Sequence, residues 1–322
     1  MRRFLPLMLY GAILFEAHAA ERGLPFMSFY PNQETEGHVQ NWDIIQDNRG
    51  IMYIGNGHGV QEFDGATWRL ITSPNKSLAR SFAMDENGRI YVGFSGEFGY
   101  LEPNEQGATQ FRSLMEYIVP EERFFNYINN IHVTAEGVYF QASEGIFRFT
   151  PISEDSPDQG KENWQVKSWK PQNRFLRAFY FNQKYYVVEY GIGLTAMEND
   201  SLIPVLGGDF FKNDRVEVML PYGKSPDHYL MGTDSRGFFI WDGQQVYPFF
   251  VESRHLIQSF PYDGVVLSDG SFAVGTITGG FYIFDDQGKI KLHLDQSTGL
   301  SANTVGTVYT DRQNNIWLGV DG

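Results

Sequence analysis

Short stretches in which every second residue is apolar alternate along the chain with polar turns rich in Gly, Asp and Asn. In residues 42–71, four such stretches are separated by the turns Asp47–Gly50, Asn56–Gly59 and Asp64-Gly65. Apolar residues at a period of two predict half-buried β-strands, and Asp-Gly between two of them is a strong hairpin signal. This segment therefore predicts four consecutive strands joined by tight turns.

The same unit recurs along the rest of the chain. A second copy spans Arg80–Phe111, and further copies begin near residues 128, 176, 216, 264 and 304. The Gly of the second strand, or the residue in its place, marks the period: Gly55, Gly93, Gln141, Val188, Gly232, Gly275 and Gly319. A period of about 40–50 residues with four strands per unit is typical of β-propellers. We therefore predict an all-β, seven-bladed β-propeller of four-stranded blades, because the unrelated strands of a sandwich would not repeat so regularly.

The last copy is incomplete, with about six full blades preceding the start of a seventh. Its missing strands are expected beyond Gly322, and the segment Phe26–Tyr30 is expected to supply its outer strand and so to join the two ends of the chain; either closure alone is the alternative. The polar insertion Ser153–Asn163 is interpreted as a surface loop. The recurrent Asp47, Asp85 and Asp311 are interpreted as structural residues of the first turn in their copies.

The first twenty residues have the pattern of an export signal. Arg2 and Arg3 precede the apolar stretch Phe4–Phe15, and Ala17-His18-Ala19 is an A-x-A cleavage site. We predict a signal peptide at 1–20 and a propeller sensor domain at 21–322; an uncleaved anchor is the alternative. The apolar stretch is shorter than the about 20 residues that a transmembrane helix needs. The chain has no Cys, so no disulfide supports the exported fold.

Composition narrows the function classes. The chain carries 25 Lys and Arg against 39 Asp and Glu, a net charge of −14, which argues against nucleic acid as a partner. Aromatic residues make up 16 %, which favours β-structure over helix.

The final copy, GLSANTVGTVYTDRQNNIWLGVDG from Gly299 to Gly322, resembles the two-component regulator propeller repeat, and the copies at Trp42 and Arg80 are similar to it. The resemblance implies the extracytoplasmic sensor of a bacterial membrane-bound receptor. It also implies a downstream membrane segment and an output module such as a histidine kinase or diguanylate cyclase. Such a sensor would act without enzyme activity of its own in this segment.

No reaction is indicated by the residues themselves. None of the seven His pairs with another ligand at metal-binding spacing, so neither a metal nor a cofactor is predicted. Gly223-Lys224-Ser225 lacks the preceding Gly and the following helix of a phosphate-binding loop, and no G-x-S-x-G motif occurs. No catalytic residue is therefore assigned.

The second-to-third-strand turns and the starts of the inner strands should converge on one mouth of a propeller. Aromatic faces, guanidinium groups and carboxylates in such a place suit a carbohydrate or another polar small molecule. The ligand-binding residues predicted on this basis are Trp42, His58, Arg80, Glu97, Glu144, Arg177, Tyr190, Arg215, Asp234 and Arg236. For any one of them, an ordinary solvated loop residue is the competing interpretation.

The sequence thus predicts an exported, periplasmic propeller that senses a small ligand and signals by a change in propeller or homodimer geometry. A periplasmic propeller lyase or hydrolase is one alternative, and a protein-interaction scaffold is another. Turnover would favour the enzyme, whereas saturable binding without turnover would favour the sensor.

Overall fold

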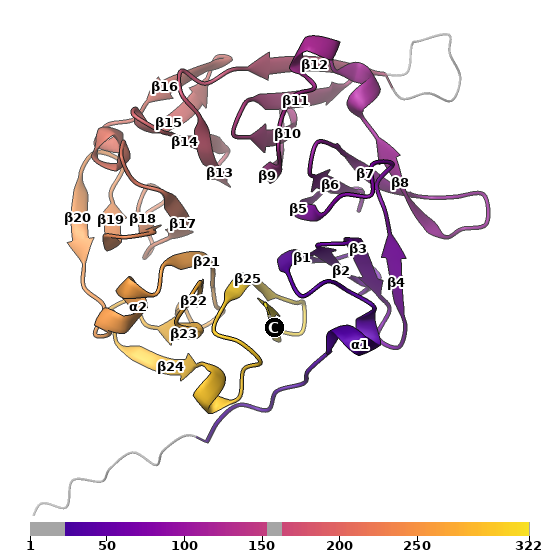
Figure 1. Ribbon diagram of the computed structural model, residues 1–322. Helices are drawn as coiled ribbons and strands as arrows, with labels where there is room; N and C mark the ends of the chain where they lie inside the picture. The colour runs from indigo at the N-terminus through magenta and orange to yellow at the C-terminus, as the bar shows by residue number, and fades with distance from the viewer. Residues whose placement is uncertain (1–22, 153–162, 322) are drawn as a thin grey trace, which may run out of the picture.

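The computed structural model of the chain describes residues 23–152 and 163–321, which form a ring of antiparallel sheets around an axis (Figure 1). The predicted signal peptide and residues 153–162 of the predicted loop lie outside the described residues. Each complete blade is a meander in which consecutive strands pair in chain order. The strand closest to the axis comes first in every blade (Figure 1).

Six blades have four strands each. The first three comprise β1 (Asn41–Gln46), β2 (Met52–Asn56), β3 (Gly59–Phe63) and β4 (Trp68–Ile71); β5 (Ala79–Met84), β6 (Ile90–Phe94), β7 (Phe98–Pro103) and β8 (Thr109–Ser113); and β9 (Ile128–Thr134), β10 (Gly137–Ala142), β11 (Ile146–Pro151) and β12 (Trp164–Trp169). The next three comprise β13 (Phe175–Phe181), β14 (Lys184–Glu189), β15 (Gly193–Glu198) and β16 (Ser201–Pro204); β17 (Val216–Pro221), β18 (Tyr229–Thr233), β19 (Gly237–Trp241) and β20 (Val246–Phe249); and β21 (Pro261–Val266), β22 (Phe272–Thr276), β23 (Phe281–Phe284) and β24 (Ile290–Leu294).

A final sheet has two strands, β25 (Val305–Thr310) and β26 (Ile316–Val320). Short helices lie in the connections: α1 (Asn32–Thr35), η1 (Met115–Tyr117), η2 (Pro120–Glu122), η3 (Gly208–Phe211), α2 (Arg254–Gln258) and η4 (Gln296–Thr298).

The first turn of several blades is held by its Asp. The Oδ1 atom of Asp47 accepts the N–H groups of Arg49, at 2.8 Å, and Ile51, at 3.0 Å, while Gly50 takes a φ of +91°. Asp85 and Asp311 accept backbone N–H groups in the same way. The interpretation of these three Asp residues as turn residues is confirmed.

The glycine that marks the period lies where neighbouring sheets come closest. A Cβ atom on Gly93 would lie 2.5 Å from the Cβ of Ile128, and one on Gly275 would lie 2.8 Å from Cγ1 of Val305. Ile128 and Val305 both belong to the inner strand of the next sheet. At Gly93 and Gly275 the next inner strand therefore packs directly on the second strand, leaving no room for a side chain.

Seven hydrophobic clusters fill the interfaces between neighbouring sheets. The largest lies between the second and third blades, where the rings of Phe98 and Phe140 stack with centroids 4.5 Å apart. Flat aromatic side chains suit the wedge between two twisted sheets because they bury a large area in a thin layer. The core of this protein is consequently a set of interface layers around the axis.

The structure corrects the predicted blade number: residues 23–152 and 163–321 form six complete blades, not seven. The predicted closing strand Phe26–Tyr30 does not form, since the residues between Gly23 and Tyr30 have no strand structure. Pro25 and Pro31 flank this segment and have no N–H group to donate to a sheet.

Side chains close the ring in its place. The ring of Tyr30 stacks on Trp317 at 5.7 Å, and the N–H of Gln46 donates to the hydroxyl of Tyr309 at 3.2 Å. An Arg312 guanidinium N–H also donates to the carbonyl of Asn48 at 3.0 Å. The two-stranded sheet is thereby joined to the first blade.

Candidate functional site

Each inner strand has a bulge near its start. One residue is extruded from the pairing with the second strand in all seven sheets: Trp42, Arg80, Asn129, Leu176, Glu217, Tyr262 and Gly306. A bulge re-aims the side chains beside it. The inner strands surround the axis (Figure 1), and residues at or beside the bulges of different blades contact one another, as Arg80 does with Tyr262 and Arg177 with Glu217. We define the axial cluster as Trp42, Asp43, Arg80, Tyr127, Arg177, Glu217, Tyr262 and Asp263.

Polar side chains after the bulge connect one blade to the next. The Oδ2 atom of Asp43 accepts the N–H of Phe82 at 2.7 Å, and that of Asp263 accepts the N–H of Val308 at 2.8 Å. Asn130 accepts the N–H of Ala178 at 3.0 Å in the same way. The axial carboxylates are thus structural links between inner strands as well as charged groups at the axis.

Arg177 is the most heavily paired cation of the cluster. Its Nη1 atom lies 2.8 Å from Oε2 of Glu217, and Nη2 lies 3.7 Å from Oδ1 of Asp263. Arg215 pairs with the other oxygen of Glu217 at 2.8 Å. Burial disfavours the charge on Arg177, but the two carboxylates outweigh it and raise its pKa.

Arg80 crosses from the second blade to the sixth. Its guanidinium lies over the rings of Trp42, 4.6 Å from the centroid, and Tyr127, at 5.2 Å. Its Nη2 atom donates to the hydroxyl of Tyr262 at 3.2 Å. Arg80 therefore contacts aromatic rings and a hydroxyl group, whereas Arg177 and Arg215 pair with carboxylates.

Burial dominates the titration of the axial acids. It raises the pKa of Asp43 from 3.8 to about 7, with a further rise from the nearby charge of Asp263, against the hydrogen bond from Phe82. Burial also raises the pKa of Asp263, partly offset by Arg177. For Glu217, the two arginines overcome the effect of burial and lower the pKa. Asp43 consequently changes charge near neutral pH whereas Glu217 stays ionised.

Four of the ten predicted site residues gather at the axis. Trp42, Arg80 and Arg177 belong to the axial cluster, and Arg215 contacts it through Glu217. The structure brings these four together because all of them lie at or within two residues of a bulge.

Three predicted residues lie in second-to-third-strand turns with solvent contact. His58 is exposed, with its ring 5.4 Å from that of His38. Tyr190 is exposed and has the Arg174 guanidinium over its ring at 5.0 Å. Asp234 is half-buried, and its N–H donates to the carbonyl of Arg215. This hydrogen bond joins Asp234 to Arg215, which pairs with Glu217 of the axial cluster.

The other three predicted residues have local structural partners. Glu97 is buried and accepts the Ser113 hydroxyl at 2.8 Å, and burial raises its pKa. Glu144 accepts an N–H of Asn126 at 3.0 Å. Arg236 pairs with Asp214 through Nε at 2.8 Å. Their polar groups are engaged by neighbouring segments of the chain.

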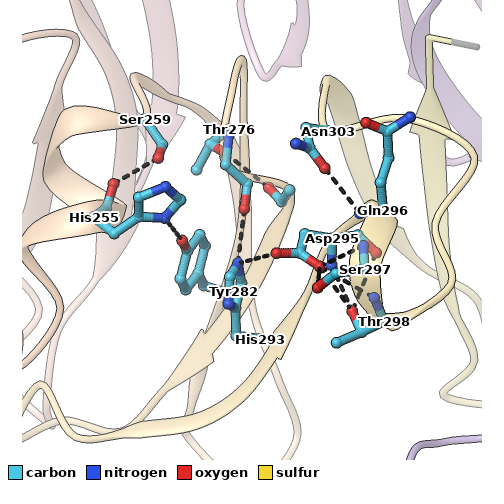
Figure 2. Close-up of polar contacts among 12 residues, drawn as sticks. His255, Ser259, Thr276, Tyr282, His293, Asp295, Gln296, Ser297, Thr298 and Asn303 are labelled. Carbon is cyan, nitrogen blue, oxygen red and sulfur yellow. Dashed lines mark hydrogen bonds and ion pairs between the residues drawn. The ribbon is translucent and has the colours of Figure 1, made fainter.

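A second group of side chains capable of acid–base chemistry lies in the sixth blade and contains two histidines (Figure 2). His255 Nδ1 lies 2.5 Å from the Tyr282 hydroxyl, and the Tyr282 ring stacks on His293 at 4.1 Å. His293 Nε2, however, donates to the carbonyl of Gly279 at 2.8 Å. Since the imidazole proton is held by a backbone carbonyl, we interpret this cluster as a structural tie between loop and turn.

Hydrogen bonds of the same loop hold a strained aromatic residue, Phe260, just before the inner strand β21. Ser259 donates to the carbonyl of His255 (Figure 2), and the Ile277 N–H is shared between the carbonyls of Ser259 and Phe260. Phe260 has a φ of +57° and an exposed side chain, two residues before Tyr262. A bulky residue rarely takes this left-handed conformation, which costs about 1–3 kcal/mol.

Two grooves lie away from the axis. One of ≈ 340 Å³ lies between the fourth and fifth blades, with Tyr186, Leu206 and Trp241 in its wall. A smaller groove of ≈ 130 Å³ lies beside Glu144, with Phe125 and Trp169 in its wall. In residues 23–152 and 163–321, no group of three His, Asp or Glu side chains is placed to hold a metal. No helix of that part of the chain is long and apolar enough to cross a membrane.

The comparison with known families gives one match. Residues 299–322, which contain β25 and β26, match the family model described as "Two component regulator propeller". Residues 299–322 are thus similar to one two component regulator propeller repeat. The family resemblance of the sequence is thereby confirmed at the repeat that matched best. No curated protein matches the chain significantly.

Several solved structures are similar to this chain in fold. One is described as the extracellular domain of a hybrid two component system from B. thetaiotaomicron, with 19 % identity and a TM-score of 0.64 over 89 % of this chain. This chain spans only 37 % of that domain. The WD40 beta propeller domain of Doa1 matches with 15 % identity and a TM-score of 0.63, covering 88 % of this chain and 91 % of that one. Streptogramin B lyase matches with 8 % identity and a TM-score of 0.63, covering 88 % and 92 %. At these identities the likeness shows the fold alone.

Several axial residues were missed by sequence reasoning. Asp43, Tyr127, Glu217, Tyr262 and Asp263 were not among the predicted residues. A signal was available, because Gly55 pairs with Asp43 and Gly275 with Asp263 in the sheets. Counting back from the marker of each propeller repeat would have placed both carboxylates at the axis.

Proposed function

We propose that this chain is the extracytoplasmic sensing propeller of a membrane-bound signalling receptor, and that its axial cluster binds a small polar ligand. The observation that carries the proposal is the two component regulator propeller repeat at 299–322. The structural likeness to a domain described as extracellular, from a two component system, is consistent with it.

The chemistry of the axial cluster suits a carbohydrate. It combines the aromatic faces of Trp42, Tyr127 and Tyr262 with guanidinium groups and carboxylates. Aromatic rings stack on the apolar faces of sugars while charged and polar groups pair with hydroxyls. A ligand here would contact inner strands of several blades at once.

Signal transmission would follow from the links between blades. A ligand that competes for Asp43 or Asp263 alters the hydrogen bonds to Phe82 and Val308, which belong to neighbouring sheets. Such a ligand shifts the propeller, or a homodimer of it, only if it binds one arrangement more tightly than the other. The output module and the membrane segment of the proposed receptor would lie outside the residues described here.

Location is tested by fusing alkaline phosphatase, which is active only after export, behind Asp321. We expect phosphatase activity from the fusion and none after deletion of residues 2–19. Equal activity without those residues would refute the proposed export signal.

Ligand binding is tested with purified chain and a panel of neutral and acidic oligosaccharides, followed by calorimetry and by chromatography of the sugars. We expect saturable binding without products, lost in Trp42→Ala and kept in Trp169→Ala, a control in the outer strand β12. Circular dichroism checks that both variants fold, and Trp42→Phe is the milder substitute. Products would favour a lyase or hydrolase, and binding of a stable protein partner alone would favour a scaffold.

A further inference from the structure

Arg80 differs from the other arginines at the axis in its partners. Arg177 and Arg215 both pair with Glu217 at 2.8 Å. Arg80 has no carboxylate within 4.0 Å anywhere in residues 23–152 and 163–321, and its polar contact there is the Tyr262 hydroxyl. A half-buried guanidinium without a counter-charge is unusual, because burying an unpaired charge is costly.

The donors of Arg80 are largely unused. A guanidinium has five N–H groups in a planar fork, and one of them donates to Tyr262. The faces of Trp42 and Tyr127 stabilise the cation from its flat side without using its N–H groups. The edge of the fork thus remains available for a planar, bidentate acceptor such as a carboxylate.

The neighbouring indole is a second, independent observation. The Nε1–H of Trp42 is buried and has no hydrogen-bond partner among the described residues. A buried donor without an acceptor costs about 1–3 kcal/mol. An acceptor group of a ligand could bind beside Arg80 and displace the side chains next to Trp42. It would then also accept a hydrogen bond from the Trp42 Nε1–H. Tyr127, whose ring Arg80 also contacts, is 39 % exposed at the same place.

We propose that the ligand of the axial cluster carries an anionic group, a carboxylate or a sulfate, which binds the Arg80 fork while its ring packs on Tyr127. An acidic sugar, such as a uronic acid or a sulfated sugar, has this chemistry. The inference rests on the proposed function in taking the axial cluster as the ligand site.

The Arg80 guanidinium itself provides the readout. Its Nε–Cζ resonances are followed by NMR in the purified chain during titration with glucuronate, sodium sulfate or glucose, and the signal that disappears in Arg80→Gln identifies the residue. We expect a saturable shift with glucuronate or sulfate and none with glucose. A shift with glucuronate alone indicates a carboxylate ligand, and one with sulfate alone indicates a sulfated ligand. An Arg80 signal that moves with neither anion, or equally with glucose, overturns the proposal.

Variants separate charge from geometry. We expect Arg80→Lys, which keeps the charge but loses the fork, to weaken glucuronate binding at least fivefold, measured by calorimetry. Arg69→Gln, which removes a cation from the outer strand β4, should leave the affinity unchanged. Unchanged affinity in Arg80→Lys would overturn the bidentate contact. Should Arg80→Gln fail to fold, Arg80→Lys identifies the resonance instead.

Failure of this inference and of the sensing proposal are distinguishable. If neutral sugars bind through Trp42 while the Arg80 signal stays fixed, the anionic ligand is wrong and sensing stands. If Arg80 binds glucuronate but the phosphatase fusion is inactive, the anion site stands and the extracytoplasmic sensor is wrong.

Discussion

Replacement of Asp43 by Asn should stabilise the propeller at high pH and change its stability little at low pH. Both carboxylate oxygens accept backbone N–H groups, Oδ1 from Ile44 at 2.8 Å and Oδ2 from Phe82 at 2.7 Å. The charged groups that face it are Asp263 and Arg177. Asn keeps the shape and one acceptor but can carry no charge.

The magnitude follows from the linkage between proton binding and folding. The pKa of Asp43 is raised from 3.8 to about 7, so the folded state holds the proton more tightly than the unfolded state. Stability therefore falls as the pH rises from about 4 to about 7 and is level above that range. A difference of about 3 pKa units corresponds to about 4 kcal/mol.

The stability gained by removing the Asp43 charge is partly offset. The Asn side chain presents an N–H donor where a carboxylate oxygen of Asp43 accepted a backbone N–H, and this costs about 1 kcal/mol. We therefore expect Asp43→Asn to be more stable than the wild type by about 3 kcal/mol at pH 8 and within about 1 kcal/mol of it at pH 5. In thermal unfolding this is about 5–10 °C in Tm at pH 8.

Thermal unfolding followed by circular dichroism at pH 5, 6, 7 and 8 checks this expectation. Asp269→Asn is the control, because hydrogen bonds from Ser271, backbone and side chain, lower the pKa of Asp269 to about 2. Asp269 is ionised in both states from pH 5 to 8, so its substitution should have the same effect throughout. An Asp43→Asn effect that is also independent of pH would refute the burial argument.

Three further changes test the packing. Gly93→Ala places a Cβ atom 2.5 Å from Ile128 of the next blade, and we expect a loss of about 1–3 kcal/mol in chemical unfolding. Glu217→Gln leaves Arg177 without its closest carboxylate, so about 3 kcal/mol should be lost, and an unchanged Tm would contradict that pairing. Tyr30→Ala removes the ring that closes the last sheet on the first blade, and about 1–2 kcal/mol should be lost together with resistance of the C-terminal strands to protease. Full protease resistance in that variant would show that the ring closes by other contacts.

The strands and turns of this protein are local properties of its sequence. Alternation of apolar residues specifies each strand, and Asp47 or Asp85 specifies a turn through hydrogen bonds to N–H groups two and four residues later. The period of the glycines predicted blades, because glycines such as Gly93 and Gly275 are a steric requirement of the neighbouring sheet. Because the unit repeats, the glycine required by this contact between blades could be recognised from a single sequence.

The number of complete blades and the site depended on tertiary structure. Whether Phe26–Tyr30 pairs as a strand is decided by competition between backbone hydrogen bonds and the packing of Tyr30 on Trp317, which no local pattern shows. Turn residues such as His58 and Arg236 carry the same residue types as ligand sites, so sequence alone could not separate them from Arg80. The bulges turn Arg80, Arg177 and residues distant in sequence toward one axis, and only there does Arg80 lack a carboxylate while Asp43 is buried enough to hold a proton. The burial and ion pairing of a side chain at the axis depend on residues from several blades that are distant in sequence. The sequence therefore determined the repeating unit, whereas the tertiary structure decided the site.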